Sequence, residues 1–426
     1  MFDALVNAFR APDIRRRILF VLGALIIIRL LAHVPVPGVD RAALANFFSS
    51  NALLGLLDLF SGGGLSTFSV VGMGVNPYIN ASIIMQLMQG VIPSLQALSR
   101  EGEYGRQRIN QITRYLTVPL ALLQAYGFLA ILYSQGIIKV FDITNIETLT
   151  QIISLTAGTV LLMWIGELMT ERGIGNGISF IIFAGIVGRV PLAIARFLES
   201  PDWTAGVLFV AIGLIVIAGI VYIQEGQRRI PIQYASRVRG RRMYQGGATF
   251  LPLRVNQAGV IPIIFAVSII LFPAQIASYF QTSQVDIVAG IATFVRNFFE
   301  NPVIYASLYF LLTVGFTYFY TAFTFKPDET ADQLRKNGGF IPGIRPGAPT
   351  RDYLSKVVYR ISLAGAVFLG VVAVSPIIFG MIFAGSVFGS FALGGTAILI
   401  VVSVVVETMK QLEAQLMMRN YEGFIR

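Results

Sequence analysis

The sequence predicts an all-α integral membrane protein with ten transmembrane helices. Its mean hydropathy is +0.72 and only 13% of its residues are charged, which is far from the composition of soluble domains. Its apolar residues form ten continuous stretches, and a hydrocarbon core of ~30 Å needs ~20 apolar residues per crossing. Basic residues gather in every second gap between these stretches. A membrane β-barrel would instead show alternating apolar residues in strands of ~10 residues.

Charged residues delimit the predicted helices in chain order. The first stretch, 18–34, holds one charge, Arg29. No charge follows Asp58 until Arg100, and the glycines of Ser61–Gly64 divide this run because consecutive glycines make a poor helix interior. A short apolar piece at 50–60 and a crossing at 75–93 result. Further uncharged runs lie between Arg114 and Lys139, Glu147 and Glu167, Arg172 and Arg189, Asp202 and Glu225, Arg254 and Asp286, and Glu300 and Lys326. The last run, between Arg360 and Glu407, has room for two helices joined around Phe383–Thr396.

The distribution of basic residues predicts the orientation. Of the 32 Lys and Arg residues, 25 lie at the two termini and in alternate gaps, and five lie in the opposite gaps. Arg29 and Arg360 complete the total. The positive-inside rule therefore places both termini, and the basic loops 224–256 and 325–357, in the cytoplasm.

The N-terminus has features of a signal peptide: Arg15–Arg17, the apolar run Ile18–Ile28 and the small residues Ala43-Leu44-Ala45. However, Arg29 ends the apolar run, and the small residues lie beyond the usual distance for cleavage. We therefore expect an uncleaved first helix.

Several classes of chemistry are excluded by residue usage. The chain has no cysteine and one histidine, His33, which excludes thiolate clusters, Cys/His zinc sites, haem held by a histidine pair and cysteine nucleophiles. His33 lies near Pro35 and Pro37, and we expect a hydrogen-bonded histidine at a helix end. The glycines at 61–64 and 173–177 are not followed by Gly-Lys-Ser/Thr, so no nucleotide site is predicted. We expect a protein that is not an enzyme, with no catalytic residue, metal or cofactor.

Carboxylates inside membrane helices would indicate an ion or proton pathway. Glu167 and Glu407 lie at predicted helix ends, and Asp58 lies in the short apolar piece. This scarcity argues against an ion-coupled transporter. A secondary transporter of a small solute nevertheless stays as the alternative, because amides and broken-helix carbonyls also bind Na⁺. A membrane scaffold is a third hypothesis.

The two large basic loops have distinct patterns. Residues 229–234 alternate as a strand does, and 243–250 can return after Arg239–Arg242, which predicts a hairpin. The second loop ends in a Gly/Pro turn, 339–347, that projects Arg345. Anionic lipid would account for the charge, at ~1 kcal/mol for each basic residue. Rigidly projected arginines favour docking of an acidic partner, either ribosomal RNA or an acidic protein.

The segment 50–74 combines an apolar piece with a glycine-rich stretch. Irregular backbone at membrane depth is tolerated only when it is buried in protein or lines a cavity. The residues of this segment are compatible with two structures: a re-entrant element beside a cavity, or an amphipathic loop outside the cytoplasm.

Several long motifs stand out along the chain: FSVVGMGVNPYINASIIMQL at 68–87 and WIGELMTERGIGNGIS at 164–179, together with GRRMY at 240–244, VNQAGVIP at 255–262 and FIPGIRPG at 340–347. These motifs resemble those of the SecY family, the channel subunits of the bacterial protein-conducting translocon. The resemblance covers essentially the whole chain. It implies two five-helix halves, 1–200 and 201–426, related by an inverted pseudo-two-fold axis around an hourglass pore.

The resemblance also implies a plug at about 52–66 that closes the outer funnel, which favours the cavity alternative for this segment. Asp58 would then face water or polar plug contacts. The plug residues are Leu56, Leu57, Phe60, Gly62, Gly63 and Gly64.

The family's constriction is a ring of aliphatic side chains. The matching residues here are Ile79, Ile83, Ile178, Ile182, Ile264 and Ile400, with Ile398 and Leu399 as neighbouring alternatives to the last. A dry aliphatic ring excludes ions by dewetting and offers a passing polypeptide no specific hydrogen bonds.

By the same resemblance, Arg241, Arg242 and Arg345 would dock the SecA motor ATPase and the ribosome. The implied partners are SecE and SecG as channel subunits, SecD/SecF, polypeptides bearing signal sequences, and membrane lipid. Helices at about 75–93, 115–138, 257–277 and 303–324 would flank a lateral exit. The expected protein passes unfolded secretory chains across the bacterial cytoplasmic (inner) membrane and releases apolar segments into lipid.

Overall fold

The computed structural model describes residues 11–50, 58, 63–188, 190–199, 203–234, 237–239, 242–244, 247–280, 286–382 and 395–422. The chain divides into two compact units. The first comprises Met1–Asp202, Ser268–Tyr305 and Ile400–Arg426, and the second comprises Trp203–Val267 and Ala306–Leu399. The expected inverted symmetry of two five-helix halves stays a prediction.

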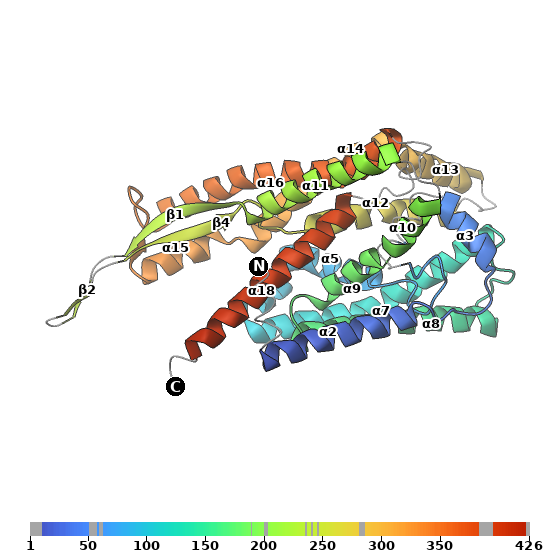
Figure 1. Ribbon diagram of the computed structural model, residues 1–426, viewed down its shortest axis with the longest axis horizontal. Coiled ribbons are helices and arrows are strands. Elements are labelled where there is room, and N and C mark those ends of the chain that lie inside the picture. Colours follow the sequence, from blue (N-terminus) through green and yellow to red (C-terminus); the bar gives the residue numbers. More distant parts are fainter. Residues whose placement is uncertain are drawn as a thin grey trace. The chain divides into compact units, whose positions relative to one another are not determined.

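The described residues are mostly helical, which confirms the all-α class, and a small sheet is added (Figure 1). Helices up to residue 202 are α2 (Pro12–Leu31), α3 (Arg41–Ser50), α5 (Asn76–Val91), α6 (Pro93–Arg100), α7 (Glu103–Ser134), α8 (Ile146–Arg172), α9 (Gly177–Val187) and α10 (Val190–Glu199). The later helices are α11 (Trp203–Glu225), α12 (Ile261–Phe280), α13 (Asp286–Glu300), α14 (Pro302–Thr324), α15 (Pro327–Lys336), α16 (Ala348–Ile382) and α18 (Gly395–Glu422).

Five stretches in the described residues are long and apolar enough to cross a membrane. They lie in α7, α8, α11, Pro302–Lys336 and α16, and the pair α5–α6, bent by 99°, would count as a sixth if its two helices form one span. The sequence predicted ten crossings. Two of the remaining predicted crossings correspond in the described residues to shorter apolar helices, Gly177–Val187 and Ile261–Ile270. Helix α2 is 20 residues long but carries Arg15–Arg17 and Arg29, so its apolar surface is interrupted by charge.

The first unit is built around α7 and α8, which run side by side with α5 against α7 and α2 against α8 (Figure 1). Asn145 caps α8 by accepting a hydrogen bond from the Glu147 amide at 2.9 Å. Glu147 in the first turn and Arg172 in the last turn have the signs that the helix dipole favours. Local sequence and tertiary packing therefore agree on this helix.

Helix α5 ends earlier than the predicted crossing at 75–93. Ile92 is extended (φ −93°, ψ 114°) because it precedes Pro93, whose ring disfavours a helical predecessor. The chain then turns by 99° into α6. The proline therefore separates the apolar α5 from the amphipathic α6.

The segment 63–75, between the glycines and α5, is irregular but packed. The Val36 amide donates to the Phe68 carbonyl at 2.8 Å, and the Val70 amide donates to the Val34 carbonyl at 2.9 Å. Phe68 has a positive φ of 47°, a strain of ~1–2 kcal/mol that burial of its ring offsets. Its ring stacks on Phe128 of α7 at 6.2 Å between centroids. These described residues therefore belong to the core of the first unit.

In the second unit, the predicted hairpin is confirmed, with the return strand placed later than 243–250. Strand β1 (Gln227–Tyr234) pairs antiparallel with β4 (Ala248–Arg254), and β2 (Arg237–Arg239) pairs with β3 (Arg242–Tyr244). Strand β5 (Gly339–Phe340) pairs with the other edge of β1. The sequence did not predict β5, because two residues carry no alternation.

Candidate functional site

Two of the predicted ring isoleucines lie on α5. Pro77 lies in the first turn of this helix, where its missing amide hydrogen costs no helical hydrogen bond. Ile79 and Ile83 are buried, with exposed fractions of 9% and 4%, and their i, i+4 spacing places them on one face. Ile84, the next residue, is 37% exposed. The pair is therefore an aliphatic stripe rather than part of a helix that is apolar and buried all round.

A second pair lies on α9, and a tight α8–α9 turn holds this helix. Asn176 caps α9 by accepting hydrogen bonds from the amides of Ile178 and Ser179, at 3.0 and 3.3 Å. Thr170 bridges the turn, since its Oγ1 donates to the Gly166 carbonyl and accepts from the Gly177 amide, each at 2.9 Å. The register of α9 is thus set by three polar side-chain contacts at its first turn.

The packing of this pair depends on a glycine. Ile182 is buried and Ile178 is half-buried. The Cδ1 atom of Ile178 lies 3.0 Å from the point where Gly166 would carry a Cβ. A larger residue at 166 would therefore displace Ile178.

The remaining two ring positions lie on α12 and α18. Ile264 is half-buried in the first turn of α12, within the second unit. Ile400 is 2% exposed on α18, where Leu399 is fully buried and Ile398 is half-buried. Because Ile264 and the other five residues belong to different units, the closed ring stays a prediction.

Most of the predicted plug lies outside the described residues, namely Leu56, Leu57, Phe60 and Gly62. Asp58 is described, and it is 4% exposed. Its carboxylate accepts from the Ser66 amide at 2.9 Å, and its carbonyl accepts from the Gly63 amide at 2.9 Å. Gly64 packs against Ser69 and Gly72. Asp58 therefore ties the end of the short apolar piece to the packed segment 63–75.

Of the three docking residues, Arg345 is the one whose surroundings are described. Arg241 lies outside the described residues, and Arg242 starts β3 opposite Arg239. Arg345 is exposed, and its carbonyl accepts from Thr350 Oγ1 at 2.8 Å. Ile344, its neighbour, packs against a buried apolar cluster. Thr350 and Ile344 therefore fix the backbone on both sides of Arg345, and its side chain projects from the turn as the sequence predicted.

That cluster is the core of a platform formed by the sheet, α15 and the start of α16. Its buried members are Ile230, Ile232, Leu253, Leu334, Ile341, Leu354, Val357 and Val358. Arg228, Arg229 and Arg254 are exposed on the strands of the same platform. The structure thus presents basic side chains on a rigid apolar base.

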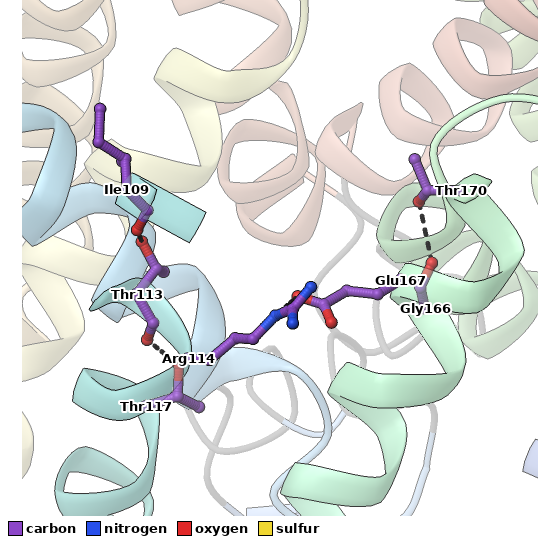
Figure 2. A network of polar contacts seen from close by, with 7 residues as sticks. All are labelled: Ile109, Thr113, Arg114, Thr117, Gly166, Glu167 and Thr170. Carbon is purple, nitrogen blue, oxygen red and sulfur yellow. Dashed lines mark hydrogen bonds and ion pairs between the residues drawn. The ribbon is translucent and has the colours of Figure 1, made fainter. Parts of the chain in front are cut away.

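Sequence reasoning missed a polar network between α7 and α8 (Figure 2). Arg114 Nε lies 2.7 Å from Glu167 Oε1, and the side chains are 44% and 17% exposed. Next to Arg114, Thr113 and Thr117 each donate to the carbonyl four residues earlier. The sequence did contain a signal for this pair, because Arg114 and Glu167 have opposite charges and each lies at the end of a predicted apolar run.

Arg29, the one charge in the first apolar stretch, reaches α9. Its Nη2 donates to the Ala184 carbonyl at 2.8 Å and contacts the Gly185 carbonyl at 3.4 Å. A cation at these last carbonyls suits the helix dipole. His33 Nδ1 lies 2.8 Å from the Arg29 carbonyl, which confirms the hydrogen-bonded histidine at a helix end.

Comparison with known proteins identifies the family. The model of the SecY family matches residues 69–409.

The chain belongs to the SecY family. It is 45% identical over 446 residues to the protein translocase subunit SecY of Mycobacterium tuberculosis, and 43% identical over 447 residues to that of Streptomyces scabiei. In both comparisons all of this chain and all of the relative are covered. The small-solute transporter alternative is left without support.

Solved structures agree at the level of the fold. A protein-conducting channel matches with a TM-score of 0.65 at 17% identity, covering 93% of this chain and 91% of the other. Sec61 in the canine ribosome–channel complex matches with a TM-score of 0.60 at 17% identity, with the same coverage. The all-α channel fold predicted from the sequence is therefore confirmed.

Proposed function

We propose that this chain is the pore-forming subunit of a bacterial protein translocase. It passes unfolded secretory polypeptides across the cytoplasmic membrane and releases apolar segments sideways into lipid. The observation that carries the proposal is the full-length similarity to SecY translocase subunits, which spans every motif discussed above. The role is conduction rather than catalysis.

The proposed conducting path is lined by the six isoleucines at 79, 83, 178, 182, 264 and 400. The stripe on α5 and the pair on α9 support it, because each places two aliphatic side chains on one helix face. An aliphatic lining binds no ion and offers no sequence-specific hydrogen bond. Such a lining suits a polypeptide substrate whose side chains differ from one chain to the next.

The proposed plug is the segment around 52–66. The hydrogen bond from the Ser66 amide to the Asp58 carboxylate supports a compact plug, because it joins two residues within this segment. Closure would come from apolar side chains.

The proposed driving partners dock on the platform around Arg345, with Arg241 and Arg242 on the hairpin. A ribosome suits this basic surface because its RNA exposes phosphates, and a SecA-type motor would dock there through acidic side chains. SecE and SecG as channel subunits and SecD/SecF as accessory factors follow from the family alone. We place both termini and this platform in the cytoplasm because of the excess of basic residues there.

Site-specific crosslinking from position 83 to an arrested secretory chain tests the function. The chain has no cysteine, so Ile83→Cys introduces a unique attachment point for a photoreactive group. We expect a crosslink that disappears when the signal sequence is disabled. Ile84→Cys, on the exposed side of the same helix, is the matched control. Crosslinks from 84 but not from 83 would show that the path runs elsewhere, and no crosslink from any helix would reject conduction.

A further inference from the structure

Helix α13 presents three different faces. One face packs on the protein, since Ala292 is 4% exposed and Val295 and Phe299 are half-buried. These residues recur at i, i+3 and i+7, as the buried stripe of a surface helix does.

The second face is apolar and exposed. Ile287, Ile291, Phe294 and Phe298 have exposed fractions of 74%, 61%, 71% and 42%. At ~100° per residue these four positions fall within an arc of about 60°. Phe294 and Phe298 also stack on each other at 6.5 Å between ring centroids. The face is therefore a continuous ridge of large apolar side chains.

The third face is polar and exposed. It is formed by Asp286, Gly290, Thr293 and Asn297. It occupies the side of the wheel adjacent to the apolar ridge, so apolar and polar surfaces run parallel along the helix. Neither water alone nor hydrocarbon alone suits both of them.

The helix is joined directly to a membrane-spanning helix. Asn301 alone separates α13 from α14, and its side chain caps α14 by accepting from the Val303 amide at 3.1 Å. Its own amide donates to the Asn297 carbonyl at 3.2 Å. Val303, in the first turn of the membrane-spanning helix, is 65% exposed, so exposed apolar surface continues from α13 into α14. The junction is therefore short and hydrogen-bonded on both sides.

We propose that α13 is an interfacial helix that anchors this chain in the lipid headgroup region. Its apolar ridge enters the acyl chains, its polar face contacts water, and the face with Ala292 stays packed on the protein. The continuity with a lipid-crossing helix favours lipid as the occupant over another protein. The distribution of basic residues places this interface on the side away from the cytoplasm.

Spin labelling of the full chain in vesicles of phosphatidylcholine and phosphatidylglycerol tests the proposal. Because the chain has no cysteine, the single variants Ile291→Cys and Phe294→Cys label the ridge, and Thr293→Cys and Asn297→Cys label the polar face. Collision rates with oxygen and with a water-soluble nickel complex then report depth. We expect ridge labels ~5–10 Å below the phosphates, and polar-face labels accessible to nickel.

Two results would overturn the proposal. Ridge labels as accessible to nickel as those at 293 and 297 would place α13 in water. Ridge labels protected from both reagents would mean that a protein, such as a second copy of the chain, covers the ridge.

A charge variant separates lipid insertion from local packing. With a label at 291, Phe294→Asp should move the label towards water, while Thr293→Asp should leave its depth unchanged. Gly290→Cys adds a further label on the polar face that should stay accessible to nickel, because a Cβ at 290 meets nothing within 4 Å. An unchanged depth in Phe294→Asp would also reject the anchor.

Discussion

Arg114 on α7 and Glu167 on α8 form an ion pair of 2.7 Å that joins two of the longest helices in the chain (Figure 2). The carboxylate is mostly buried, with 17% of the side chain exposed, so water screens this pair less than a surface pair. The pair therefore links α7 to α8 at this level.

We predict that breaking this pair destabilises the protein. Glu167→Ala should lower the free energy of unfolding by about 1–3 kcal/mol, because the guanidinium loses a charge-assisted partner. A double-mutant cycle with Arg114→Ala, followed by chemical denaturation in detergent, should give a clear coupling energy. The pair of Lys326 and Glu329, with both side chains largely exposed, is the control and should couple by ~0.5 kcal/mol or less. Equal coupling in the two cycles would contradict a structural role for the α7–α8 pair.

Gly158 on α8 is predicted to tolerate no side chain. A Cβ there would overlap the carbonyl oxygen of Val70, in the packed segment before α5. Gly158→Ala should therefore cost about 3 kcal/mol or displace the segment, detectable as a lower melting temperature and faster proteolysis near residue 70. Gly23→Ala on α2 is the control, because a Cβ there meets nothing within 4 Å. A Gly158→Ala protein as stable as Gly23→Ala would mean that α8 and the segment are not in contact.

Polar substitutions in the proposed ring should raise the resting ion leak. Ile83→Ser and Ile182→Ser each place a hydroxyl where the lining is aliphatic, which hydrates the constriction. Lowering the barrier by about 1.4 kcal/mol would raise conductance about tenfold in planar bilayers. Ile84→Ser, on the exposed side of α5, should leave conductance unchanged. A leak that is unchanged in both ring variants would remove these residues from the seal.

Charge reversal at Arg345 should abolish motor-driven secretion and leave the fold intact. Its side chain is exposed, and the turn is held through its carbonyl by Thr350 rather than through its guanidinium. Arg345→Glu should therefore melt like the parent chain but fail to translocate in vesicles supplied with the motor and ATP. Arg335→Glu, exposed on α15, is the control and should keep most of its activity. Full secretion by Arg345→Glu would reject docking at this turn.

The amino-acid sequence alone was sufficient to predict the membrane class, the hairpin and the family. Hydropathy and charge decide which segments leave water and which loops stay in the cytoplasm, and both are properties of composition along the chain. The Gly/Pro turn around Arg345 was also visible, because glycine and proline restrict the backbone locally. The long, specific motifs were likewise enough to identify the SecY family.

The folded structure was needed to show which residues, distant in the chain, meet in space. It paired Arg114 with Glu167 and placed Arg29 on the last carbonyls of α9. It also placed Phe68 in the core with a positive φ, against its local preference. These contacts join residues far apart in the chain, and they form because burial and hydrogen bonding in the folded unit outweigh local propensity. No window of sequence contains that information, because the partners become neighbours only after the helices pack.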